Sequence, residues 1–189
     1  MSIDSILPDY AAGRQDAMNA FKVLATNNDR AFENWKAFTR NLLTHVNPYT
    51  QRAYCDEPCV AMVEINNENA LFNEYNHGGI DGLREPFATE FRTQWNAWLR
   101  KKYGTTEAVL KAWKWPNKPL CDEQIADASF RSGAESLLAP SHTVEAGTIP
   151  ALTRNAFAPR AARADFVQFL VDTETAYWTG MYRFLKDEL

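Results

Sequence analysis

Long apolar runs and clusters of basic residues are both absent from this sequence of 189 residues. No stretch approaches the roughly 18–20 consecutive apolar residues of a membrane-spanning helix, and the first ten residues lack the basic start and apolar run of a secretory signal. The net charge is −4, and no window collects enough Lys and Arg to neutralise a run of phosphates. We therefore expect neither a membrane nor a nucleic acid as a partner, and the localisation stays open.

Cysteine and histidine are scarce as well, with three of each. The odd number of cysteines leaves at least one thiol outside any internal disulfide, and a bridge between Cys55 and Cys59 stays an open alternative. A zinc site at that pair would need two further ligands, but the histidines stand far away in sequence without ligand-like spacing. No Gly-rich phosphate loop and no signature of a nucleophilic Ser or Cys is present. We therefore expect no metal and no cofactor.

Apolar residues, in contrast, make up 46% of the sequence, and 13% of all residues are aromatic. This composition is sufficient for a packed core, so we expect a globular chain. The six Trp exceed what a core usually requires, and sugar-binding clefts use aromatic faces as platforms. For any single ring, however, a place in the core is the commoner use.

Apolar residues recur at spacings of three and four in several segments, as they do on the buried stripe of an amphipathic helix. Asp29 fits an N-cap of the first long segment, and Gly104 fits the C-terminal stop of another. Between residues 116 and 159, five Pro and little periodicity predict a long loop, with one short helical turn near 122–130. The predicted helices cover residues 29–46, 87–103, 105–113 and 160–185, and a shorter helix at 18–24 stays open.

Residues 59–65, with the sequence CVAMVEI, are mostly apolar and rich in β-branched side chains. The run is too short for a typical helix and predicts a strand. It stops abruptly at residues 66–69, Asn-Asn-Glu-Asn, so four polar residues follow where the strand would leave a sheet. Taken alone, such residues are more often a simple polar turn than a functional site.

An apolar strand that ends in Asn67-Glu68, with Glu64 four positions before Glu68, resembles the fourth strand of the clan A glycoside hydrolases. The similarity to a cellulase-like, β-galactosidase-like group in that clan continues in LLTHVNPYT (42–50), DEP (56–58), WNAWL (95–99) and KYGT (102–105). This resemblance implies an α/β fold, a partial (β/α)8 TIM barrel. Residues 1–189 would then be a single incomplete barrel segment, mostly helical, with the third helix, one strand at about 59–65, a long insertion and the fourth helix.

The resemblance also implies an enzyme, a retaining β-glycosidase that hydrolyses O-glycosidic bonds of a carbohydrate substrate. Glu68 would be the acid/base, which protonates the leaving glycosidic oxygen and then takes a proton from water. Asn67 would hydrogen-bond the sugar 2-hydroxyl, and Glu64 would bind a basic partner inside the barrel. The nucleophile of the family has no counterpart here, so we expect the chain alone to be inactive.

His77 and Tyr75 lie downstream of Glu68 and are weaker candidates for substrate contacts, because a solvated loop histidine is the commoner arrangement. An alternative from another class is a non-catalytic helical binding or interaction protein derived from a barrel fragment. Its exposed apolar faces would be covered by a partner or by self-association with a second copy.

Overall fold

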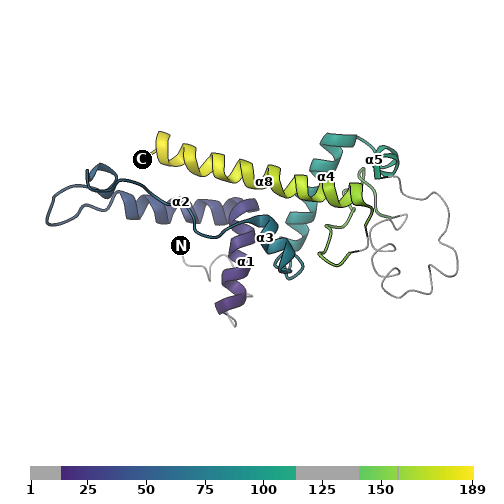
Figure 1. Ribbon diagram of the computed structural model, residues 1–189, viewed down its shortest axis with the longest axis horizontal. Coiled ribbons are helices and arrows are strands. Elements are labelled where there is room, and N and C mark those ends of the chain that lie inside the picture. Colours follow the sequence, from purple (N-terminus) through teal and green to yellow (C-terminus); the bar gives the residue numbers. More distant parts are fainter. Residues whose placement is uncertain (1–13, 114–140, 157) are drawn as a thin grey trace. The chain divides into compact units, whose positions relative to one another are not determined.

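The structure, a computed structural model, describes residues 14–113, 141–156 and 158–189. The chain divides into two compact units: unit 1 consists of Met1–Glu74 with Asp172–Leu189, and unit 2 consists of Tyr75–Val171. Helices joined by irregular segments make up both (Figure 1). They are α1 (Arg14–Asn27), α2 (Asp29–Leu43), the short 3-10 helix η3 (Tyr54–Asp56), α3 (Leu71–Asn76), α4 (Phe87–Tyr103), α5 (Thr106–Trp113) and α8 (Arg160–Asp187).

The described residues contain no strand, and their one isolated β-bridge joins Val46 to Ala53. The prediction of an α/β fold, a partial (β/α)8 TIM-barrel fragment with a strand at 59–65, is therefore wrong. Residues 60–66 are irregular (Figure 1). A β-prone sequence becomes a strand only where a neighbouring strand takes up its N–H and C=O groups, and the described residues provide no such neighbour.

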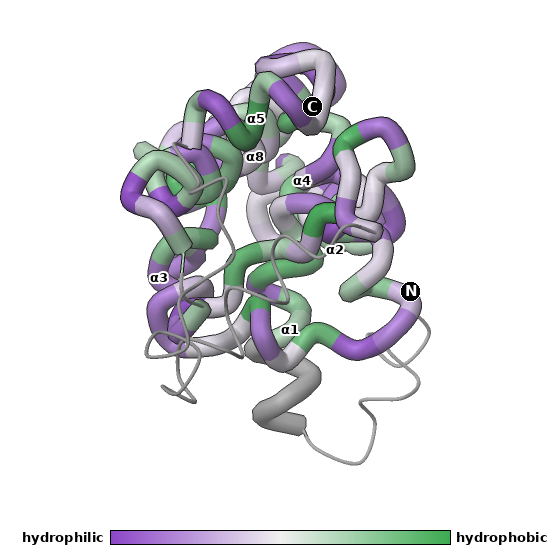
Figure 2. Tube along the Cα trace, turned by 90° about the vertical axis from the view of Figure 1, so that its right-hand side faces the viewer, coloured by the Kyte–Doolittle hydropathy of each residue, from purple (hydrophilic) through white to green (hydrophobic). Residues whose placement is uncertain are grey.

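The predicted helices are found, with small differences at their ends. Of the predicted range 29–46, residues Asp29–Leu43 form α2. Its N-cap is Asn28 rather than Asp29, because the Asn28 side chain accepts a hydrogen bond from the Ala31 N–H at 3.0 Å. The predicted stop at Gly104 is confirmed, with a φ of 79° that suits glycine. The turn predicted near 122–130 lies outside the described residues. Hydrophobic and hydrophilic residues are interspersed along the helices (Figure 2).

The core of unit 1 lies between α1, α2 and the part of α8 that follows Asp172. Met181 and Tyr177 are buried there, and the Phe32 ring meets the Tyr177 ring edge-on at 5.8 Å. Gly180 allows this close contact between α8 and the Phe32 ring, because a Cβ at that position would come within 3.1 Å of the ring. Burial of these aromatic and apolar groups is the main source of stability for unit 1.

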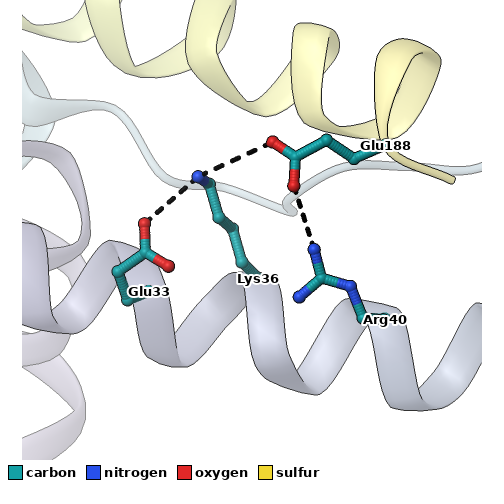
Figure 3. Close-up of polar contacts among 4 residues, drawn as sticks. All are labelled: Glu33, Lys36, Arg40 and Glu188. Carbon is teal, nitrogen blue, oxygen red and sulfur yellow. Dashed lines mark hydrogen bonds and ion pairs between the residues drawn. The ribbon is translucent and has the colours of Figure 1, made fainter.

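Charged side chains add a second link between α2 and the C-terminal residues of unit 1 (Figure 3). The Glu188 carboxylate lies 2.9 Å from the Arg40 guanidinium and 4.0 Å from the Lys36 amine, which also pairs with Glu33 at 3.1 Å. The Arg40 and Glu188 side chains are about half exposed. Such surface pairs contribute little to stability individually.

Unit 2 is built around Trp95, whose side chain is fully buried. Its ring stacks on Trp113 at 6.4 Å and meets Phe166 edge-on at 5.2 Å, while its indole N–H donates to the Pro150 carbonyl at 3.1 Å. The side chain of Asn96 binds the main chain of Ile149 in both directions, at 2.7 and 3.0 Å. These contacts fasten the irregular segment 141–156 to α4.

A buried carboxylate joins α4, α5 and α8 within unit 2. Asp165 accepts hydrogen bonds from the Tyr103 hydroxyl at 2.6 Å, the Trp113 indole N–H at 2.8 Å and the Lys102 amine at 2.8 Å. Burial, together with the hydrogen bond and the charge of Asp165, raises the pKa of Tyr103. The phenol therefore remains a neutral donor, and the network ties three helices together.

Candidate functional site

The segment that carries Asn67 and Glu68 is a turn anchored on both sides in unit 1. Before the pair, the Asn66 amide donates to the Tyr177 hydroxyl at 3.1 Å, and after it the Asn69 side chain is buried. Both Asn67 and Glu68 are exposed between these anchors. The turn therefore holds its ends inside the unit and presents an amide and a carboxylate to solvent.

Glu68 has a left-handed backbone conformation, with a φ of 51°. This region is costly for a residue with a Cβ, and it persists only where the surroundings impose it. The anchors at Asn66 and Asn69 are one constraint, and a hydrogen bond from the Lys22 amine to the Glu68 carbonyl at 3.5 Å is another. Left-handed residues of this kind are enriched at functional sites, which motivates attention to Glu68.

Tyr177 is the inner support of the turn. Burial raises the pKa of its hydroxyl, and the Glu174 carboxylate adds to this rise, while hydrogen bonding from Asn66 and Asn69 opposes it. The hydroxyl therefore stays neutral and can accept from Asn66. The Asn69 amide interacts with this hydroxyl, although neither its nitrogen nor its oxygen makes a hydrogen bond of normal geometry with the described residues.

Two further carboxylates of unit 1 serve the structure around the turn. Glu174 accepts from the Leu71 N–H at the start of α3 and from the Trp178 indole N–H, both at 3.3 Å. The buried Glu74 lies 3.9 Å from the amine of Lys22. Both carboxylates thus have partners that explain their position. Glu64, for which the resemblance implied a basic partner inside a barrel, is exposed in the irregular segment.

Tyr75 and His77, the weaker candidates, belong to unit 2. Tyr75 is buried: its hydroxyl donates to the Thr153 carbonyl at 3.3 Å and accepts from the Arg163 guanidinium at 3.1 Å. Burial is the main cause that raises the pKa of this hydroxyl. These contacts give Tyr75 a structural role inside unit 2. His77, in contrast, is exposed.

Unit 2 also contains a hollow of about 230 Å³ that the sequence did not predict. Its polar groups already have protein partners, since the Arg100 guanidinium donates to the carbonyls of Val144 and Glu145 at 2.9 and 2.7 Å. Asn96 and Arg100 are spaced by one helical turn, but nothing in the sequence of residues 144–147 indicates that this segment would cover them. The hollow is lined by Thr93, Asn96, Ala97, Arg100, Val144, Ala146 and Gly147.

The described residues hold no group of three or more His, Cys, Asp or Glu side chains that could bind a metal ion. Cys55 and Cys59 are exposed free thiols, and Cys121 lies outside the described residues. None of the described helices has the length and hydropathy that a bilayer crossing requires.

Comparisons with family models, curated proteins and solved structures found no significant match. The resemblance to the glycoside hydrolases therefore depends on the short motifs alone, and the roles of Asn67 and Glu68 stay predictions.

Proposed function

We propose that this chain supplies the acid/base part of a retaining β-glycosidase that acts on a carbohydrate, with Glu68 as the acid/base and Asn67 as the contact to the sugar 2-hydroxyl. The observation that carries the proposal is the anchored turn, which combines the Asn67-Glu68 motif with a left-handed Glu68 exposed to solvent. A general acid must reach the glycosidic oxygen of its substrate, and it must also lie in a walled cleft that favours its neutral form. The proposal therefore requires that another part of the enzyme covers this exposed turn.

The proposal requires a second carboxylate from outside the described residues. In a retaining mechanism one carboxylate attacks the sugar while the acid/base protonates the leaving oxygen, and water later releases the sugar with the acid/base as the proton acceptor. Glu74 and Glu174, with their structural partners, do not provide that nucleophile. The walls that exclude water from the reacting bond must come from the same additional part.

The test is hydrolysis of aryl β-glycosides by the full product of the gene and by the chain of 189 residues. We expect turnover only by the full product, and Glu68→Gln should lower kcat roughly 100-fold to 10,000-fold, the usual contribution of an acid/base. Glu64→Gln is the matched control, because Glu64 is an exposed carboxylate four residues earlier. An equal effect of both changes, or none from Glu68→Gln, would refute the acid/base role.

A second candidate function, a non-catalytic helical interaction protein, is favoured by the exposed apolar side chains of unit 1. Phe38 on α2 is 65% exposed and Tyr49 is 93% exposed, and Leu42 and Val46 between them are about half exposed. Apolar surface of this extent usually marks contact with another protein. A full gene product that forms a stable complex but hydrolyses no glycoside, with or without Glu68, would support this candidate over the glycosidase.

A further inference from the structure

Lys22 on α1 connects the turn of Asn67 and Glu68 with a buried carboxylate. Its amine lies 3.5 Å from the Glu68 carbonyl oxygen and 3.9 Å from the Glu74 carboxylate on α3. The Glu74 side chain is 9% exposed, and the Lys22 side chain is 37% exposed. Within the described part of the chain, the amine has no other hydrogen bond or ion pair. Lys22 is therefore shared between these two acceptors.

The Glu74 carboxylate depends on Lys22. Its only ion pair with a described residue is the one to Lys22, and none of the hydrogen bonds among these residues ends on its oxygens. Loss of one member of a buried ion pair leaves the other charge uncompensated, which costs more than the pair itself contributes. The Lys22 amine therefore cannot turn into solvent without that cost, and the buried carboxylate keeps it beside the turn.

The carbonyl that Lys22 contacts belongs to the left-handed residue of the turn. With a φ of 51°, Glu68 has a backbone conformation that residues with a Cβ rarely adopt. A change to a right-handed or extended conformation would reorient this carbonyl and break its charge-assisted hydrogen bond from the amine. The amine, kept in place by Glu74, therefore favours the left-handed conformation.

We propose that Lys22 and Glu74 are positioning residues for Glu68. Glu74 holds the Lys22 amine, the amine holds the Glu68 carbonyl, and the backbone conformation fixed in this way sets the direction of the Glu68 side chain. The consequence for hydrolysis rests on the proposed glycosidase, in which Glu68 is the acid/base. An acid displaced by about 1 Å can slow such a reaction roughly 100-fold, and Lys22 and Glu74 act on it only through the backbone.

The first experiment observes the backbone of Glu68 by NMR in the chain of 189 residues. A left-handed residue brings its N–H close to its own Hα, so the wild type should show an intense NOE between these two protons at Glu68. The double variant Lys22→Met with Glu74→Gln removes both charges and leaves neither unpaired, so it should fold and yet lose this signal. Glu74→Gln alone should also weaken the signal, because it releases an intact Lys22 from the buried carboxylate.

Two further variants separate this role from a general effect on stability. Lys22→Arg keeps a cationic donor at the same position and should retain the signal. Lys36→Met removes a lysine of the same unit whose ion pairs are with Glu33 and Glu188, and it should also retain the signal. A full NOE in the folded double variant or in Glu74→Gln overturns the proposal. Absence of the NOE from the wild type, or its loss in Lys36→Met or Lys22→Arg, overturns it as well.

The second experiment measures the consequence for hydrolysis of an aryl β-glycoside by the full product of the gene. Because a positioning residue acts on the transition state, the double variant should lower kcat roughly 100-fold with KM nearly unchanged, and Lys22→Arg should retain most of the activity. Activity that falls in Glu68→Gln but not in the double variant overturns the positioning role while the glycosidase stands. If the wild type hydrolyses nothing, the glycosidase fails, and the NOE alone decides whether Lys22 and Glu74 set the backbone of Glu68.

Discussion

Unit 2 and the loop region of unit 1, defined as residues 44–70, use their apolar residues in opposite ways. In unit 2 the rings around Trp95 are packed, and their polar atoms bind main-chain carbonyls or Asp165. In the loop region, Tyr49 and Met62 are almost fully exposed, and residues 61–65 have no main-chain bonds to the described chain. Similar apolar residues thus form a core only where other segments of the chain pack against them.

The largest expected effect tests whether unit 2 depends on its central ring. Trp95→Ala removes a fully buried side chain and leaves a cavity, so it should lower the free energy of unfolding by about 3–5 kcal/mol. Tyr49→Ala, at a position 93% exposed in the loop region, should change it by less than about 0.5 kcal/mol. Urea denaturation followed by far-UV circular dichroism measures both values. Similar losses for the two variants would show that the contrast between the regions is false.

A second comparison concerns buried and exposed carboxylates. Asp165→Ala leaves the donors of Tyr103, Trp113 and Lys102 without their acceptor and should cost about 3 kcal/mol. Glu64→Ala, in the loop region, should have almost no effect on unfolding. The same urea titration applies, and hydrogen exchange of α5 should become faster only in the Asp165 variant.

The sequence predicted the elements of unit 2 better than the environment of the loop region. The apolar periodicity of residues 87–103 and the glycine at 104 are local signals, and α4 confirms both. The cap of α5 is only partly local. The Thr105 hydroxyl accepts from the Ala108 N–H, but the Glu145 carboxylate, 39 residues from Thr106, also accepts from the Thr106 N–H. The hydrogen bonds from Thr106 lower the pKa of Glu145, and no sequence pattern indicated this long-range contact.

The wrong prediction of a strand at 59–65 also results from contacts that the local sequence does not determine. Its composition favours a strand, but strand formation depends on a neighbour whose presence the local sequence does not encode. For the candidate site, the motif identified Asn67 and Glu68, whereas the supports of the turn, Tyr177 and Lys22, come from distant segments. Contacts across more than 40 residues could not be predicted from short motifs.

A third, smaller effect depends on pH. Because the fold raises the pKa of Tyr103 above 10.0, the stability it contributes is complete below pH 10 and is lost as the pH rises beyond it. At pH 8, Tyr103→Phe should cost about 1 kcal/mol through the lost hydrogen bond to Asp165. The difference between the two proteins should shrink above pH 10. Tyr49→Phe, at an exposed position, is the control and should show neither effect.

The smallest effect is expected for the ion pairs between α2 and the C-terminal residues of unit 1. Glu188→Gln removes the charge that Arg40 and Lys36 share, and it should cost less than about 1 kcal/mol in low salt. Because the side chains are half exposed, most of this difference should vanish in 1 M NaCl. Thermal unfolding at two salt concentrations measures it, and a cost that persists in high salt would contradict the surface character of the pairs.

The left-handed backbone at Glu68 also determines how a substitution at this position changes the stability. Glycine adopts that conformation without steric penalty, so Glu68→Gly would relieve up to about 1–2 kcal/mol of strain while it deletes the carboxylate. A chain optimised for folding alone would accept this exchange, because nothing in the local packing demands a long acidic side chain there. A Glu68→Gly variant that is more stable but lacks the proposed hydrolysis would show this exchange directly.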